Sequence, residues 1–264
     1  MLPRVVMNVF DMKKITDFVI SERCDFGKVS MLVLHSHDEL PYIFPGQFVQ
    51  VRADGAKHTY LRRPISIHDV DYEHHNVTLL VQRVGEGTNA ICDSEVGSVL
   101  NVVYPLGNGF SVSSDWKSVL LVGGGIGAAP LLYLAKILNA KGLQLSVLLG
   151  GKTKHDLIRI DEYRKYADVM ITTDDGSLGE KGFVSQHSVW NSRDFDHIAV
   201  CGPLPMMKSV AAMARQKNAD CEVSLENMMA CGLGACLCCV ENTKEGNVCV
   251  CKEGPVFNIN RLLW

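Results

Sequence analysis

The 264-residue sequence lacks a large excess of either charge, with 26 Lys and Arg against 29 Asp and Glu. A net charge of −3 gives no electrostatic reason to bind nucleic acid or an anionic membrane. The sequence also opens without the basic, apolar and small-residue sections of a signal peptide, since Asp11, Lys13 and Lys14 follow the first ten residues. We therefore expect a cytoplasmic protein that has neither nucleic acid nor a membrane as a partner.

Long hydrophobic runs are also scarce, and only residues 118–135 approach the length of about 18 that a membrane helix needs. This uncharged stretch contains Gly123, Gly124, Gly125, Gly127 and Pro130 near its middle. Such residues break a helix, so a strand, a tight turn and a following helix explain the run better than a membrane span.

Cysteine, in contrast, is abundant: the chain has ten, and six of them lie in residues 229–255, here called the cysteine segment. A chain of this length has room for about two domains with a proper core and does not need disulfides to fold. In a reducing compartment, clustered cysteines bind metal or carry out redox chemistry more often than they form structural disulfides.

The first 110 or so residues contain short β-rich runs separated by turn residues. Runs of this spacing are typical of an antiparallel barrel or sandwich. The runs cover residues 29–36, 47–54, 63–70, 77–84 and 98–106.

The pattern then changes to alternating strands and helices, which predicts a parallel sheet. Residues 118–125 form a continuously apolar strand, as expected for a sheet covered on both faces. We expect further strands at 145–151, 168–175 and 197–203, and helices at 126–140, 155–167 and 205–219.

The cysteine segment contains Cys231, Cys236 and Cys239 in the spacing C-x4-C-x2-C. This is the plant-type spacing for a 2Fe–2S cluster, in which a fourth cysteine follows later. Small residues fill the first gap, so the backbone can wrap closely and direct its N–H groups at the sulfurs. A zinc site is the alternative, but zinc prefers paired C-x2-C knuckles, and pairing Cys236/Cys239 with Cys249/Cys251 would leave Cys231 unused.

From the residues alone, the fourth ligand is either Cys249 or Cys251. Cys238 is a poor candidate because it stands beside Cys239, and two adjacent residues rarely point at one cluster.

A 2Fe–2S cluster exchanges single electrons, so a chain that also handles a nicotinamide needs a flavin between the two.

A candidate nicotinamide motif is LVGGGIGAAP, residues 121–130, which follows a buried strand and opens a helix. Glycines there let the backbone approach a pyrophosphate at a helix N-terminus. The motif departs from G-x-G-x-x-G, and a tight packing turn is its alternative reading.

A candidate flavin site combines residues 61–67 (LRRPISI) with residues 85–88 (GEGT), although Arg62 or Arg63 would more often be a solvated charge.

Together these motifs resemble the electron-transfer subunits of NAD-dependent dihydroorotate dehydrogenases, within the ferredoxin-reductase-like superfamily. The resemblance rests on RPIS, GGGIGAAP, TDDGSLGEKGFV (173–184), CGPLPMM (201–207) and MACGLGACLCCV…CKEGPVF, and it covers essentially the whole chain. It implies an FAD-binding antiparallel barrel at 1–112, an NAD-binding α/β domain at 113–222 and a small 2Fe–2S domain at 223–264.

The resemblance also implies roles for individual residues. The last cluster ligand directly precedes the acidic-Gly-Pro-Val-Phe stretch, which selects Cys251 over Cys249 and completes the set with Cys231, Cys236 and Cys239. The FAD site would comprise Arg63, Pro64, Ile65, Ser66, Val81, Gln82, Arg83, Gly87 and Thr88. No catalytic residue is expected in this chain, because the catalytic base belongs to a partner subunit.

Residues at the predicted carboxyl ends of the parallel strands complete the nicotinamide site, since ligands bind at that edge of an open sheet. They are Gly123, Gly124, Gly125, Gly127, Asp174, Asp175, Cys201 and Gly202. A capped turn is the alternative for the two aspartates, and a small buried residue is the alternative for Cys201. The nine histidines form no ligand spacing, and we predict that they lie on the surface.

The predicted function is electron transfer in pyrimidine (UMP) synthesis: from the FMN of a separate catalytic subunit, through 2Fe–2S and FAD, to NAD+. The expected assembly is a heterotetramer with two copies of each subunit. Because the cluster must face the partner, the compact loop from Cys239 to Cys251 and the Phe257/Trp264 tail are candidate interface elements. Two alternatives are a related NAD(P)H reductase subunit acting on ferredoxin or a sulfur compound, and a zinc-stabilised nucleotide-sensing or interaction module.

Overall fold

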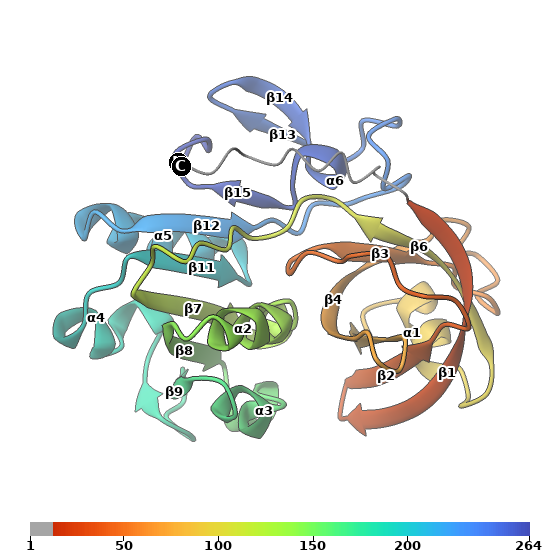
Figure 1. Cartoon of the computed structure of the whole chain (residues 1–264), viewed down its shortest axis with the longest axis horizontal. Helices are drawn as coiled ribbons and strands as arrows, with labels where there is room; N and C mark the ends of the chain where they lie inside the picture. The colour runs from red at the N-terminus through yellow and green to blue at the C-terminus, as the bar shows by residue number, and fades with distance from the viewer. Residues whose placement is uncertain (1–12) are drawn as a thin grey trace.

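The computed structural model describes residues 13–264 and has three parts, shown in Figure 1: a barrel, a parallel sheet with helices, and a C-terminal layer that touches both. The predicted combination of an antiparallel barrel and a parallel-sheet domain is confirmed.

The barrel is closed by six antiparallel strands in the order β1-β2-β5-β4-β3-β6. Alternate residues of its strands point inward, as in β2, where Ser30, Leu32 and Leu34 are buried and their neighbours are half-exposed. The strands are β1 (Lys14–Phe26), β2 (Val29–His35), β3 (Phe48–Val51), β4 (Arg63–Asp71), β5 (Asn76–Gln82) and β6 (Val99–Leu106), with helix α1 (Glu86–Asp93) between the last two.

The second part is a seven-stranded sheet in the order β10-β9-β8-β7-β11-β12-β15, parallel except for its last strand. Its central strands are buried almost throughout, which matches their continuous apolar runs. The strands are β7 (Ser118–Gly124), β8 (Gln144–Gly151), β9 (Asp168–Thr173), β10 (Glu180–Lys181), β11 (His197–Cys201) and β12 (Asp220–Ser224). The helices are η1 (Gly125–Ala128), α2 (Leu131–Ala140), η2 (Lys154–Asp156), α3 (Ile160–Arg164), η3 (Val184–Gln186), α4 (Val189–Ser192) and α5 (Leu204–Gln216).

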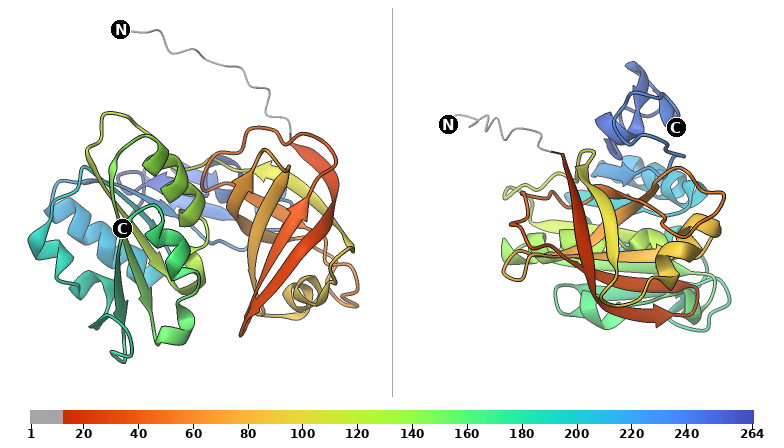
Figure 2. Two further views of the ribbon diagram at one scale, coloured as in Figure 1. Left: turned by 60° about the horizontal axis from the view of Figure 1, so that its bottom comes forward. Right: turned by 90° about the vertical axis from the view of Figure 1, so that its right-hand side faces the viewer.

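The C-terminal layer consists of the hairpin β13 (Val240–Thr243) and β14 (Gly246–Cys249), helix α6 (Val250–Glu253) and strand β15 (Val256–Asn258). Strand β15 extends the parallel sheet by pairing antiparallel with β12. On the other side, Phe48 and Leu106 of the barrel share one apolar core with Cys239, Cys251 and Phe257. The cysteine segment is therefore packed against both other parts, as Figures 1 and 2 show.

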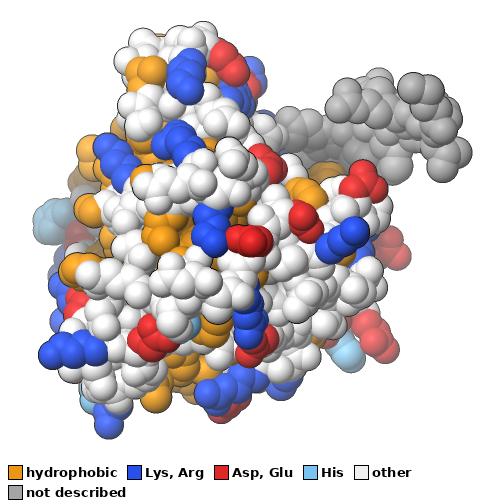
Figure 3. Space-filling model, turned by 90° about the vertical axis from the view of Figure 1, so that its left-hand side faces the viewer, with side chains coloured by type: hydrophobic (Ala, Val, Ile, Leu, Met, Phe, Trp, Pro, Cys, Tyr) orange, Lys and Arg blue, Asp and Glu red, His pale blue; other side chains and the backbone are white. Residues whose placement is uncertain are grey.

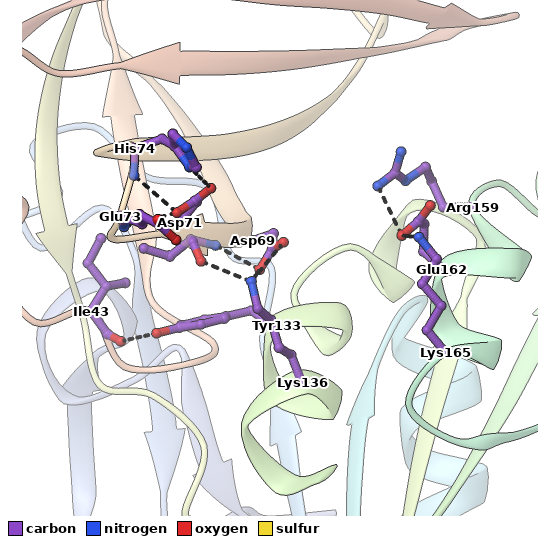
Figure 4. A network of polar contacts seen from close by, with 11 residues as sticks. Ile43, Asp69, Asp71, Glu73, His74, Tyr133, Lys136, Arg159, Glu162 and Lys165 are labelled. Carbon is purple, nitrogen blue, oxygen red and sulfur yellow. Dashed lines mark hydrogen bonds and ion pairs between the residues drawn. The ribbon is translucent and has the colours of Figure 1, made fainter. Parts of the chain in front are cut away.

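A polar seam joins the barrel to helix α2 (Figure 4). Lys136 Nζ lies 3.1 Å from a carboxylate oxygen of Asp69, and the Tyr133 hydroxyl donates to the Ile43 carbonyl at 3.2 Å. Deeper in the seam, Nδ1 of His68 is 2.7 Å from the carbonyl oxygen of Ala129, at the end of the glycine motif. These contacts fix the barrel, at strand β4 and at Ile43 before β3, relative to helix α2 and the turn before it.

Several predictions were wrong. Only Ile160–Arg164 of the expected helix at 155–167 is α-helical. Three of the nine histidines are buried, namely His68, His187 and His197, because each sits between packed elements that cover its ring. Phe257 is buried in the core beneath the C-terminal layer and is not a surface residue.

The surface shows no segregation of charge on the face drawn in Figure 3, where basic and acidic side chains are interspersed with apolar ones. No helix within residues 13–264 has both the length and the apolar character to cross a membrane.

Candidate cofactor sites

A cleft of about 650 Å³ opens at the carboxyl edge of the parallel sheet and is here called the sheet-edge cleft. Its walls come from the ends of β7, β8 and β9, from the start of α5, and from one barrel residue, Gln82. The residues that line it are Gln82, Gly124, Gly125, Ile126, Gly150, Gly151, Lys152, Asp156, Thr172, Asp174, Gly182, Phe183, Val184, Ser185, Pro203, Pro205, Met206 and Ser209. A cleft at this edge, reaching to the barrel, has the position and size for a nucleotide.

The four glycines of the predicted nicotinamide motif divide into two kinds. Gly124 and Gly125 line the sheet-edge cleft, and Gly125 has a φ of +54°. Gly127 instead packs against Gly202, where an added Cβ would lie 2.5 Å from the Gly202 Cα, and Gly123 packs against Ala128. The motif is thus partly a ligand-facing turn and partly the packing turn that was its alternative reading.

The two predicted aspartates also have different surroundings. Asp174 lines the cleft. Asp175 accepts hydrogen bonds from the Ser177 amide at 2.9 Å and hydroxyl at 2.7 Å, so it caps a turn, and these bonds lower the pKa of its carboxyl. Lys152 adds a cation to the cleft wall.

Cys201, at the end of β11, is completely buried. Its burial is the main reason that the pKa of its thiol is raised, and the negative charge of the nearby Glu226 raises that pKa further. Its Sγ is 3.9 Å from a carboxylate oxygen of Glu226. Glu226 lines a recess of about 280 Å³ that also contains Gly202, Lys208, Glu241 and Trp264. Glu226 as a whole residue is exposed, yet burial of its carboxyl group raises the pKa of that group. The sequence analysis did not single out Glu226, since a lone glutamate after a strand carries no motif.

The predicted flavin strand is the start of β4, where Arg63, Pro64, Ile65 and Ser66 are all half-exposed. The Arg63 side chain crosses directly over Gly87 in the first turn of α1, where an added Cβ would lie 2.7 Å from the Arg63 Cδ. A guanidinium beside free helix N–H groups is a suitable site for a pyrophosphate.

The side chains of other predicted flavin residues already have partners within the protein, which limits the groups that they can present to a flavin. The Thr88 hydroxyl accepts from the amides of Val84 and Gly85, so it shapes the loop before α1. Val81 is buried inside the barrel, which leaves only its backbone available, and Arg83 forms a 2.7 Å ion pair with Asp93. Gln82 lines the sheet-edge cleft and connects the two predicted sites.

Four cysteines of the C-terminal part lie together as two pairs. Cys231 contacts Cys236, and Cys251 contacts Cys239, whose Sγ also accepts the Cys251 amide at 3.3 Å. Within residues 13–264, no three metal-ligating side chains converge on a single point. Two thiolates on each of two irons is the arrangement of a 2Fe–2S cluster, so these four residues fit that group.

Backbone N–H groups surround the sulfurs, as expected from the small residues in the first gap. Leu233 donates to Cys231 Sγ at 3.3 Å, and Gly234 donates to Cys251 Sγ at 3.1 Å. Burial alone would raise the pKa of the Cys231 thiol, but donors from Leu233, Cys236 and Ala235 outweigh it and lower the pKa to about 6. The loop therefore favours negatively charged sulfur at Cys231, whereas burial, followed by the neighbouring Cys239, raises the pKa of the Cys251 thiol to about 12 despite the Gly234 donor.

The two remaining cysteines of the segment lie differently. Cys249 Sγ donates to the Gly234 carbonyl at 3.8 Å, and burial raises the pKa of its thiol. Cys238 is exposed. Cys236 is exposed as well, and so are the apolar side chains of Leu233 and Leu237, which places this rim of the loop at the protein surface.

Two family models match the chain. The iron-sulfur cluster binding domain of dihydroorotate dehydrogenase B matches residues 226–263, and the oxidoreductase NAD-binding domain matches residues 121–212.

Similar proteins cover most of the chain. The dihydroorotate dehydrogenase B (NAD(+)) electron transfer subunit of Fusobacterium nucleatum is 42% identical, covering 81% of this chain and 84% of its own length. The protein of the same name from Caldanaerobacter subterraneus is 38% identical, covering 93% and 97%. Among solved structures, an NADH-dependent reduced ferredoxin-NADP oxidoreductase involved in flavin-based electron bifurcation matches with a TM-score of 0.84 and 30% identity, over 96% of this chain and 91% of that one.

Proposed function

The chain belongs to the family of electron transfer subunits of dihydroorotate dehydrogenase B, and from this membership we propose its function and its site residues. The proposed function is to carry electrons from a catalytic partner that oxidises dihydroorotate to NAD+, in pyrimidine synthesis. The observation that carries the proposal is the packing of the Cys239/Cys251 pair against the barrel strand β3, whose neighbour β4 is the predicted flavin strand.

The cofactors are FAD, a 2Fe–2S cluster and NAD. The cluster exchanges single electrons, NAD+ accepts a hydride, and the flavin converts between the two. The protein contributes binding and positioning. The three functional parts are residues 1–112 for FAD, 113–222 for NAD and 223–264 for the cluster.

We assign the cluster ligands as Cys231, Cys236, Cys239 and Cys251. Their pairwise contacts and the N–H donors around them support this set, whereas Cys249 bonds a carbonyl oxygen instead. At the sheet-edge cleft, Gly124, Gly125 and Asp174 contact the nicotinamide nucleotide, while Gly123, Gly127 and Gly202 shape the turn behind it.

For the flavin, Arg63 and the first turn of α1 hold the pyrophosphate, and the half-exposed residues Pro64 to Ser66 face the ring. Gln82 contributes from the next strand, and Val81 contributes its backbone alone.

The partner is an FMN-containing catalytic subunit, in a heterotetramer with two copies of each chain. The exposed side chains of Leu233 and Leu237 beside Cys236 support a docking surface at the rim of the cluster loop. All ten cysteines are unpaired, which fits a reducing, cytoplasmic location.

A related reductase acting on ferredoxin is the second candidate, favoured by the solved structure at 30% identity. The relatives at 38–42% identity favour the first candidate, electron transfer from a partner that oxidises dihydroorotate.

The test is an anaerobic titration of the purified chain with NADH, followed by visible absorption and electron paramagnetic resonance. We expect flavin bleaching together with the signal of a reduced 2Fe–2S cluster. The isolated chain should pass electrons from NADH to an artificial acceptor and leave dihydroorotate unchanged until the FMN-containing partner is added. Bound zinc without iron or bleaching would disprove the proposal, and reduction of ferredoxin instead of orotate would favour the second candidate.

A further inference from the structure

Gln50 lies in the middle of β3 and is completely buried, yet neither polar atom of its carboxamide has a hydrogen-bond partner. Among the side chains of residues 13–264, only Gln50 has two buried polar atoms without a hydrogen-bond partner. Buried amides are almost always paired, because leaving them unpaired costs free energy. An unpaired donor and acceptor at one position therefore indicate that something else faces this side chain in the working protein.

The direction of the Gln50 side chain follows from the strand. Val49 and Val51 point into the barrel and belong to its core, so Phe48 and Gln50 point outward. Phe48 packs into the core that contains Cys239 and Cys251. Gln50 is two residues further along the same face, so it also points at the cysteine segment.

The contact of Gln50 with the cysteine segment is close. An added Cβ on Gly232 would lie 2.8 Å from the Gln50 Cγ and 3.0 Å from its Nε2. Gly232 directly follows Cys231, and its φ of +69° favours glycine as well. The amide nitrogen of Gln50 is thus held against the loop whose backbone N–H groups already point at sulfur.

The strand that pairs with Gln50 is β4, the predicted flavin strand. In the β3–β4 ladder, Gln50 is the partner of Pro64, and Val49 and Phe48 are the partners of Ile65 and Ser66. Cross-strand partners have their Cβ atoms about 5 Å apart. Gln50 therefore stands between the strand assigned to the flavin and the loop assigned to the cluster.

We propose that Gln50 is a positioning residue for the cluster: its buried carboxamide N–H donates a hydrogen bond to sulfur on the Cys231 side and makes the cluster easier to reduce. The inference depends on the cluster site of the proposed function. A donor to sulfur stabilises the more negative, reduced state, so the bond raises the reduction potential.

The test uses the complete protein with FAD and cluster, and replaces Gln50 by Met or by Glu. Met has nearly the same length and removes the amide with little change in volume, while Glu keeps the shape and adds negative charge. A redox titration follows the cluster by electron paramagnetic resonance and the flavin by visible absorption in the same sample. Gln144→Met makes the same exchange at an exposed position on β8, away from the cluster, and serves as the control.

We expect the cluster midpoint to become more negative in Gln50→Met, by a shift equivalent to about tenfold in the equilibrium for reduction, and more negative still in Gln50→Glu. The g-values of the reduced cluster should change with it, and Gln144→Met should match the wild type. A cluster that keeps its midpoint in both Gln50 variants, or a shift confined to the flavin, would overturn the inference. If the wild type itself gave no 2Fe–2S signal, the proposed function would fail and this inference with it.

Discussion

The sheet-edge cleft and the cysteine segment are built in different ways. The cleft is formed by the ends of strands whose interiors are buried almost throughout, and the turn behind it packs backbone to backbone at Gly127 and Gly202. The cysteine segment has only the short hairpin β13–β14 and the single turn of α6 as regular structure, and its apolar core is shared with Phe48 and Leu106 of the barrel.

This difference has a physical consequence. The cleft is determined by the same burial that stabilises the sheet, so it should exist before any ligand binds. The cysteine segment gathers thiols and N–H donors around a charged group, so bonds to that group contribute directly to its folding. Predictions that separate the two regions follow, from the largest expected effect to the smallest.

The largest effect is expected from Cys251→Ser, which removes one proposed ligand from a segment with little regular structure of its own. The variant should lose most of its iron, measured by iron and sulfide content, and should still bind NADH, because the cleft does not depend on this residue. Cys249→Ser is the matched control and should keep its cluster. Iron loss only in the Cys249 variant would reverse the ligand assignment.

Arg63→Ala should weaken FAD binding by about tenfold to a hundredfold, because it removes a charged hydrogen-bond donor beside the first turn of α1. Flavin retained after gel filtration, and a titration of the stripped protein with FAD, measure the change. Arg52→Ala removes an exposed arginine, paired with Asp54, from the same barrel and should have no effect on FAD affinity. Equal losses in both variants would place the flavin elsewhere.

A pH dependence is expected from His68, which holds the end of the glycine motif through Ala129. Burial lowers the pKa of its ring to about 4, so the folded chain takes up this proton only near pH 4, while the unfolded chain takes it up near pH 6.5. The free energy of unfolding should fall as the pH is lowered through this interval, with a His68 contribution of about 2 kcal/mol by pH 5. Urea unfolding of the wild type and His68→Gln at pH 7 and pH 5 measures it. An equally steep pH dependence in the variant would contradict this origin.

The smallest effects separate the two aspartates of the cleft region. Asp174→Ala should raise the KM for NADH by about threefold to tenfold, since Asp174 lines the cleft. Asp175→Ala should leave that KM unchanged and slightly lower the free energy of unfolding, because Asp175 is exposed and caps a turn. Steady-state kinetics and thermal unfolding of both variants test the pair.

Much of this fold could be predicted from local sequence. The β-rich runs of the barrel, the apolar strand at 118–124 and the glycine turn after it are patterns of neighbouring residues, and the structure has them where expected. The failures occur where distant residues decide. The run at 155–167 has a helical pattern, yet the chain there starts in the short helix η2, whose Lys154 amide donates to the distant Ser177 hydroxyl at 2.8 Å, and the α-helix is limited to Ile160–Arg164. His68 looks like a surface residue until Ala129, 61 positions away, covers it.

The sequence by itself determined the chemistry of this protein. The spacing of Cys231, Cys236 and Cys239 specifies cluster ligands, and the glycines after the first parallel strand specify a tight turn. Each of these features is formed by a short, continuous segment of the chain. The tertiary structure decided which residues work together. It placed Cys251 beside Cys239, Arg63 over Gly87, and Gln50 between Pro64 and Gly232. These contacts join strands and loops far apart in the chain, and they arise only when burial of the shared core brings the barrel, the sheet and the cysteine segment together.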